Sequence, residues 1–161
     1  MENQKSSSDF NKEDFVLVAP RTFKDLKVGE IFRAPSRTVT DAHASAFQAV
    51  SCDNHPMHYD KEYALRHGHP APVVHGLQVV AFTAPGATLF SHYVGEVFIA
   101  ISSVCYEFLK EVHAGDTLYA ALEITDLIDN GATGTVVAGV TVHNQNSELV
   151  LKGEQRGVLK N

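Results

Sequence analysis

The sequence has no tryptophan, only two cysteines and two methionines among 161 residues, and no run of basic side chains. The two cysteines, Cys52 and Cys105, are too few for a disulfide scaffold and are typical of a chain kept in a reducing cytosol. A domain of this length buries enough apolar surface to fold without disulfides or a structural metal. Thirteen Lys and Arg against nineteen Asp and Glu give a net charge of −6, which disfavours nucleic-acid and anionic-membrane partners.

The opening segment, residues 1–14, lacks the apolar stretch of a secretory signal and is polar and Ser-rich. We expect a disordered tail here, followed by a single domain over residues 15–161. Between Arg66 and Glu96 there is no Asp, Glu, Lys or Arg, but the His, Gln and Pro residues in this stretch argue against a membrane span. The sequence therefore predicts a cytoplasmic protein that is not embedded in a membrane.

The first half of the chain is predicted to hold one short strand and several helices. Residues 31–39 read as a strand that Pro35 places at an edge or a bulge. Thr40 is a candidate N-cap for a helix that ends near residue 51, and Asp60 can cap a shorter helix through residue 66. An apolar helix is expected from about Val73 to residue 84, where Pro85 must stop or kink it.

The second half of the chain alternates apolar and polar residues with a period of two, which is typical of strands with one buried face. Turn residues at 114–116, 129–131 and 144–146 separate the runs, so residues 96–159 are predicted to form a four-stranded antiparallel meander. An apolar helix beside such a sheet is best buried when the curved sheet wraps around it. The predicted fold is therefore α+β, a single hot-dog fold.

Two polar segments flank the predicted apolar helix and carry the candidate chemistry. The first is the loop Asp53-Asn54-His55-Pro56-Met57-His58, and the second is Val73-Val74-His75-Gly76 at the helix start. A carboxylate and an imidazole five residues apart across a Pro-containing loop can hold and deprotonate one water molecule. The free N–H of Gly76 at a helix N-terminus can stabilise negative charge on a carbonyl oxygen.

The residues from Asp41 to Thr83 resemble the MaoC-like dehydratases, including the (R)-specific enoyl-CoA hydratases. The characteristic loop of that family is Gly-Asp-x-Asn-Pro-φ-His, with φ apolar; here His55 occupies the position of the family's Asn. A Ser that some hydratases carry on the central helix aligns with Ala84, and Thr83 is the nearest hydroxyl. The resemblance implies a hot-dog fold, usually dimeric, that hydrates trans-2-enoyl thioesters to (R)-3-hydroxyacyl thioesters or runs the reverse dehydration.

Carried over residue by residue, the resemblance makes Asp53 and His58 the catalytic pair and Gly76 the donor to the thioester oxygen. His55, His75 and Thr83 are further candidates for binding the oxyanion or the substrate. The implied enzyme is a lyase of fatty acid metabolism that needs no cofactor and no metal. Its expected partners are an acyl-CoA or acyl-carrier thioester and a second copy of itself, as a homodimer or a higher homo-oligomer.

Other interpretations of the same residues stay open. A hot-dog thioesterase would use Asp53 to activate water against the thioester carbonyl, and a non-catalytic acyl-thioester-binding subunit would bind substrate without turnover. Cys52, His55 and His58 are spaced like metal ligands, but the proline between them works against that geometry. Cys52 is expected to be an inert thiol, since the sequence shows no base beyond its proximity to His55.

Overall fold

The computed structural model describes residues 10–161, so part of the predicted N-terminal tail lies outside the described residues. Two single 3-10 turns, η2 (Lys12–Phe15) and η3 (Phe23–Asp25), precede the first strand. The elements that follow are β1 (Ile31–Arg33), β2 (Arg37–Thr38), α1 (Asp41–Ser51), η4 (Pro56–His58), α2 (Lys61–Arg66), α3 (Gly76–Ala81), η5 (Pro85–Ala87), α4 (Phe90–Val94), β3 (Phe98–Phe108), β4 (Thr117–Asp129), β5 (Thr133–His143) and β6 (Leu149–Lys160).

The sheet is antiparallel, and its strand order is β1-β4-β5-β6-β3, with β2 paired to β4. The prediction of a simple four-stranded meander was wrong in one respect: β3 pairs with β6 and not with its sequence neighbour β4. Residues 109–116 carry the chain across the end of the sheet, held by main-chain bonds such as Val74 N–H to Val112 O at 2.8 Å. Gly153 permits the close β3–β6 contact, because a Cβ there would lie 2.2 Å from the Cys105 carbonyl oxygen.

The predicted strand at residues 31–39 is divided at Pro35 into β1 and β2, which both pair antiparallel with β4. Proline has no N–H to contribute to a ladder, so the pairing stops there and resumes beyond it. The predicted helices at residues 40–51 and 60–66 are confirmed as α1 and α2. Gly68, expected to end the second of them, has a φ of +88°, which a residue with a Cβ adopts only with strain.

The apolar helix α3 is shorter than the expected span of residues 73–84. Val73 forms an antiparallel bridge with His113, which keeps the chain extended until the helix begins at Gly76. At the other end Ala84 has φ −54° and ψ 136°, because the residue before a proline is pushed out of the helical region. Only α3 therefore lies within the expected span, and the short elements η5 and α4 follow beyond the predicted break at Pro85.

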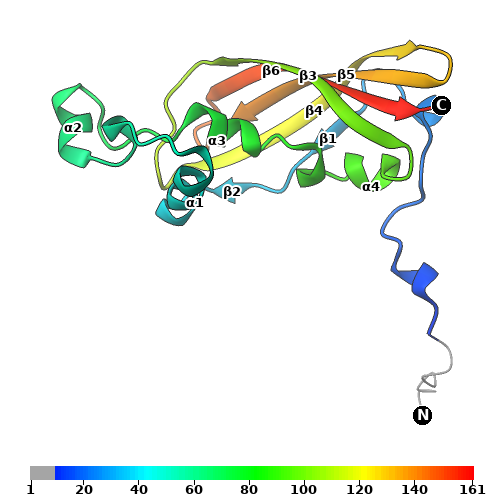
Figure 1. The fold of residues 1–161 in the computed structure, drawn as a ribbon, viewed down its shortest axis with the longest axis horizontal. Helices are drawn as coiled ribbons and strands as arrows, with labels where there is room; N and C mark the ends of the chain where they lie inside the picture. The colour runs from blue at the N-terminus through cyan, green and yellow to red at the C-terminus, as the bar shows by residue number, and fades with distance from the viewer. Residues whose placement is uncertain (1–9) are drawn as a thin grey trace.

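The core lies between the inner face of the sheet and the short helices α3 and α4, which lie along that face (Figure 1). The residues that alternate inward on β4 are buried, as the period of two predicted, and so are their counterparts on β5. Burial of each such aliphatic side chain contributes about 1.5–3 kcal/mol to stability. These findings confirm the predicted α+β hot-dog architecture. No helix within residues 10–161 is long and apolar enough to cross a bilayer.

Gln78 on α3 is 3% exposed, and neither polar atom of its side chain has a hydrogen-bond partner among the described residues. A buried amide without partners costs about 1–3 kcal/mol of folding free energy. We expect Gln78→Met, which keeps the side-chain length and removes both polar atoms, to raise the free energy of unfolding by about 1–2 kcal/mol. Urea denaturation followed by circular dichroism measures this change.

Gln155 on β6 provides the matched control, since it is also buried but its amide nitrogen has hydrogen-bond acceptors. Its Nε2 donates to the Thr83 carbonyl and Thr83 Oγ1, each at 3.0 Å, and to Tyr106 Oη at 2.5 Å. The same change, Gln155→Met, leaves these acceptors without their donor and should lower the free energy of unfolding by about 1–3 kcal/mol. Changes of the same sign in the free energy of unfolding of the two variants would contradict the prediction.

Candidate active site

The loop after α1 is shaped by its own side chains. Cys52 ends the helix in a left-handed conformation, with φ +57°, at the position where the family pattern has glycine. Asp53 then accepts the backbone N–H of His55 through Oδ1 at 3.1 Å, and His55 Nδ1 accepts the N–H of Met57 at 3.3 Å. These turn contacts fix the Asp53 carboxylate and leave its second oxygen, Oδ2, free to face the interior of the loop.

His58 is held by a single strong contact to the segment that leads into α3. Its Nδ1 lies 2.6 Å from the main-chain oxygen of Val73, whose own N–H donates to Met57 O at 3.1 Å. A carbonyl oxygen only accepts, so Nδ1 carries the hydrogen and Nε2 of the neutral ring presents a lone pair. This contact fixes the orientation of the His58 ring and directs Nε2 away from the Val73 carbonyl.

The Nε2 lone pair of His58 faces the Asp53 carboxylate. Nε2 and Oδ2 are 3.9 Å apart, too far for a direct hydrogen bond but well placed to share one small polar group. The Asp53 side chain is 49% exposed, whereas that of His58 is 16% exposed. The carboxylate is therefore open to solvent, and the imidazole is largely enclosed. This geometry suits a water molecule that is held by hydrogen bonds alone and can lose a proton to one of the two side chains.

His75 and Gly76 complete the cluster at the start of α3. The ring of His75 stacks on that of His58 with 3.8 Å between centroids, and its Nε2 lies 3.8 Å from Asp53 Oδ2. Gly76 is the first residue of α3, so its N–H has no acceptor within the helix. The structure therefore brings Asp53, His58, His75 and Gly76 together, although the loop and the helix start lie apart in sequence.

An apolar cleft of about 520 Å³ opens beside this cluster. His58 and Gly76 lie at its wall, together with Leu77, Val79, Phe108 and Val112. The Phe108 ring stands directly over Gly76, where a Cβ would lie 2.8 Å from its nearest carbon. Glycine at this position thus lets the Phe108 ring pack directly against the start of α3.

A metal ion is the other occupant to consider, because Asp53, His58 and His75 offer ligand atoms within 4.8 Å of one another. The two imidazole rings are stacked with an interplanar angle of 25°, so their in-plane lone pairs run nearly side by side and do not converge. His75 Nε2 is also engaged by the Tyr59 hydroxyl at 2.8 Å. The arrangement fits a shared water better than tetrahedral zinc.

The remaining predicted site residues lie elsewhere or point elsewhere. The imidazole of His55 caps the turn η4 in place of the family's amide. Thr83, 1% exposed, follows the end of α3, and its hydroxyl donates to Val80 O at 2.7 Å within the network of Tyr106 and Gln155. Substrate binding by Thr83 or His55 stays a prediction. Sequence reasoning missed Tyr59, although its place directly after His58 was a usable signal.

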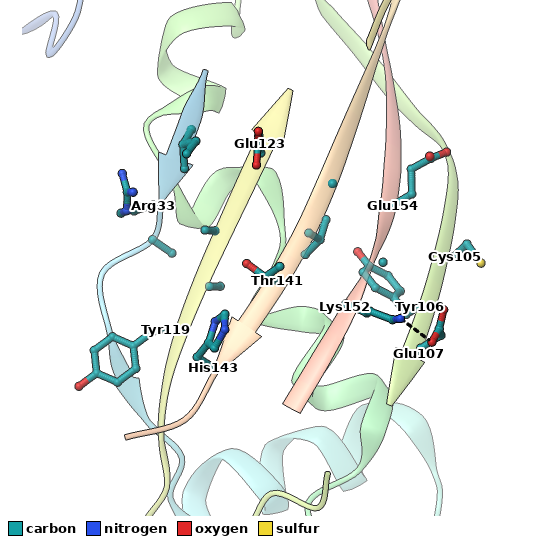
Figure 2. A pocket seen from close by; sticks show the side chains of 17 residues that line it. Arg33, Cys105, Tyr106, Glu107, Tyr119, Glu123, Thr141, His143, Lys152 and Glu154 are labelled. Atoms are coloured by element: carbon teal, nitrogen blue, oxygen red, sulfur yellow. Dashed lines mark ion pairs between the residues drawn. The ribbon is translucent and has the colours of Figure 1, made fainter. Parts of the chain in front are cut away.

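A larger hollow, of about 830 Å³, lies on the outer face of the sheet, away from this cluster. Figure 2 shows its charged rim, with Arg33, Glu123 and Glu154 around a floor of small residues and with Lys152 paired to Glu107 at 3.1 Å. None of the predicted site residues lines it. Two of the predicted site residues, His58 and Gly76, line the apolar cleft instead.

Comparison with known proteins agrees with this geometry. The MaoC-like domain family matches residues 24–146 of the chain. The chain belongs to the MaoC-like family. This MaoC-like domain is 28% identical over 148 residues to a mitochondrial 3-hydroxyacyl-[acyl-carrier-protein] dehydratase of Arabidopsis thaliana, covering 91% of the chain and 84% of the relative.

Two further relatives of the MaoC-like domain bear on fold and chemistry. An (R)-specific enoyl-CoA hydratase of Aeromonas caviae is 28% identical over 135 residues, covering 81% of the chain and 93% of the relative. A solved structure described as a monoamine oxidase regulatory protein of Archaeoglobus fulgidus superposes with a TM-score of 0.81 at 27% identity, covering 91% of this chain and 99% of that one. The family and the hot-dog fold are thereby established, and the two relatives compared by sequence are named as a dehydratase and a hydratase.

Proposed function

We propose that this protein is a hydro-lyase that adds water across the double bond of an enoyl thioester, giving an (R)-3-hydroxyacyl thioester, and that it catalyses the reverse dehydration. The observation that carries the proposal is the pairing of Asp53 Oδ2 with the Nε2 lone pair of His58 at 3.9 Å. The N–H of Gly76, which has no acceptor within α3, and an apolar cleft lie beside that pair. The named activities of the two relatives point to the same reaction.

The proposed reaction follows from the groups of the site that can accept or donate a proton. A water held between Asp53 Oδ2 and His58 Nε2 adds through its oxygen to Cβ of the substrate, and the Nε2 lone pair accepts the departing proton. The electron pair of the double bond moves to Cα, with charge spread onto the thioester oxygen, where the Gly76 N–H stabilises it. A solvent molecule carries that proton from His58 Nε2 to Asp53 Oδ2, 3.9 Å away, and the Asp53 carboxyl group delivers it to Cα, so no proton is consumed.

The apolar cleft supplies the place for an acyl chain. Leu77, Val79 and Val112 line it beside His58, and apolar walls with few polar groups are typical of sites that bind aliphatic ligands. The carrier, CoA or acyl carrier protein, would remain at the exposed mouth, on the side where Asp53 reaches solvent. The proposed substrate class is therefore a 2-enoyl thioester with an aliphatic tail.

Direct assay tests the proposal. Purified protein is mixed with a panel of enoyl-CoA and enoyl-pantetheine thioesters of increasing chain length, and the loss of conjugated-enoyl absorbance is followed together with release of free thiol. Hydration removes the absorbance and releases no thiol, and chiral analysis of the product should give the (R) alcohol. Thiol release would establish a thioesterase in its place, and tight binding without turnover would establish a binding subunit.

Gly76→Ala tests the role of the helix start. The added methyl group must displace the Phe108 ring and stands beside the N–H, so kcat/KM should fall about 10- to 100-fold. Gly86→Ala is the matched control, since a Cβ at Gly86 meets nothing within 4 Å, and it should retain full activity. Adding Phe108→Leu to Gly76→Ala should restore part of the loss; equal activity of Gly76→Ala and wild type would contradict the assignment.

We also propose a homodimer formed along β3. This strand pairs with β6 on one side only, and its apolar side chains Ile99, Val104 and Phe108 are about half exposed. Leu77 on α3 is 67% exposed. An open edge strand with exposed apolar residues is a template for pairing, and a second copy related by a two-fold axis would cover both features.

Val104→Lys tests the proposed dimer. A charged side chain at the centre of β3 opposes edge pairing, so the variant should elute as a monomer when wild type elutes as a dimer in size-exclusion chromatography with light scattering. Tyr119→Lys is the control, because Tyr119 is similarly exposed, at 48%, but lies on β4 away from that edge. A monomeric wild type, or a dimeric Val104→Lys variant, would refute the interface.

A further inference from the structure

Tyr59 makes a contact that the proposed reaction does not use. It follows η4 directly, and its hydroxyl oxygen lies 2.8 Å from Nε2 of His75. Its ring also lies beside both site histidines, 6.1 Å from His58 and 5.3 Å from His75 between centroids. One side chain of the loop thus reaches the buried imidazole at the start of α3.

The hydrogen atoms of His75 can be assigned from its surroundings. The ring is 3% exposed, and Nδ1 is buried without a hydrogen-bond partner among the described residues. Nε2 lies 3.4 Å from the main-chain oxygen of Asp53, which can only accept. A buried N–H without an acceptor is rarer than a buried lone pair without a donor, so both arguments place the hydrogen on Nε2.

With its hydrogen on Nε2, His75 donates to Tyr59 Oη and to the Asp53 carbonyl. The same ring supports both members of the proposed catalytic pair, since it stacks on His58 at 3.8 Å and approaches Asp53 Oδ2 to 3.8 Å. Rotation of this ring would therefore alter the spacing between acid and base. Tyr59 is the acceptor at 2.8 Å that opposes such rotation.

We propose that Tyr59 and His75 act as a positioning pair, in which the Tyr59 oxygen holds His75 as the Nε2–H tautomer and so keeps Asp53 and His58 aligned on one water molecule. This inference rests on the proposed hydration. It goes beyond the family's loop pattern, which does not specify the residue at position 59. Neither residue exchanges a proton with the substrate. Their contribution is geometric and acts through the stacked rings.

The ionisation of Tyr59 is compatible with this role. Burial of the phenol, and to a smaller extent the negative charge of Asp53, raise the pKa of Tyr59 above its ordinary value. The hydroxyl therefore stays neutral to a higher pH than a free phenol does. A neutral oxygen beside Asp53 accepts from His75 without adding a second negative charge to the site.

Tyr59→Phe keeps the ring and removes only the acceptor. We expect kcat for hydration to fall about tenfold, with KM changed less than about twofold, because loss of one buried hydrogen bond misaligns the reacting groups and not the substrate. In a His75→Phe background, Tyr59→Phe should lower kcat less than about twofold, since the hydrogen-bond partner of Tyr59 is already absent. Additive losses in the double variant would overturn the proposal.

A measurement independent of catalysis separates this proposal from the proposed function. Long-range proton–nitrogen NMR of the histidine rings reports the tautomer directly, and we expect Nε2–H for His75 and Nδ1–H for His58 in wild type. Tyr59→Phe should shift the His75 signals or mix its tautomers. Tyr63→Phe is the control, because its ring stacks on the exposed His67. An Nδ1–H tautomer for His75, or unchanged signals in Tyr59→Phe, would refute the positioning pair even if hydration is confirmed.

Discussion

Asp53→Asn should lower kcat for hydration of an enoyl thioester by about 10³- to 10⁴-fold, as expected for loss of a general acid–base group. The amide keeps the shape of the side chain, and its oxygen can still accept the His55 N–H that fixes the loop at 3.1 Å. What it loses is the negative charge and the basic oxygen that faces His58. Steady-state kinetics on the substrate identified by the thioester panel measure the effect.

Asp129→Asn is the matched control for that experiment. Asp129 also accepts a backbone N–H two residues later, that of Gly131 at 2.8 Å, but it is the last residue of β4 and does not line the cleft. The control carries the same change of charge and should retain wild-type kcat. Because the Asp53 side chain is half exposed, its replacement should change the free energy of unfolding by less than about 1 kcal/mol. A kcat within tenfold of wild type would remove Asp53 from the mechanism.

His58→Asn should lower kcat about 10²- to 10³-fold, because it removes the base and keeps the anchor. The side-chain nitrogen of Asn occupies the position of Nδ1 and can still donate to the Val73 carbonyl, whereas nothing replaces the Nε2 lone pair. KM should change little, since the lost group acts on water and not on the acyl chain. Kinetics over a range of substrate concentrations separate the two parameters.

The control for His58 is His67→Asn. His67 Nδ1 contacts the main-chain oxygen of Tyr63 at 2.8 Å, the same kind of contact that His58 makes, but at an exposed position after α2. This variant should be as active as wild type. If His67→Asn and His58→Asn lose activity equally, the effect is on folding and not on proton transfer.

Much of the fold could be predicted from local pattern. The period of two on β4 and β5, the caps Thr40 and Asp60, and the turn glycine Gly68 act over a few residues, so the sequence alone indicates them. Pro35 and Pro85 marked real interruptions for the same reason. The pairing of β3 with β6, and the late start of α3, depend on contacts between distant segments, such as Val73 with His113.

The candidate site shows the same division. The spacing of Asp53, His58 and Gly76 within a family pattern pointed to acid–base chemistry before any geometry was known. The tautomer of His58 could not be predicted, because it depends on the Val73 carbonyl fifteen residues away. Nor could the role suggested for Tyr59, because it depends on a buried ring on another element.

The sequence by itself determined the kinds of side chain available, the strand and helix periods and the family to which the chain belongs, because these are properties of neighbouring residues. Only the tertiary structure decided which atoms face one another: the lone pair of His58 toward Asp53, the ring of His75 against that of His58, and the Phe108 ring over Gly76. Such contacts form when the sheet closes over α3 and excludes water, and that packing is a property of the whole chain.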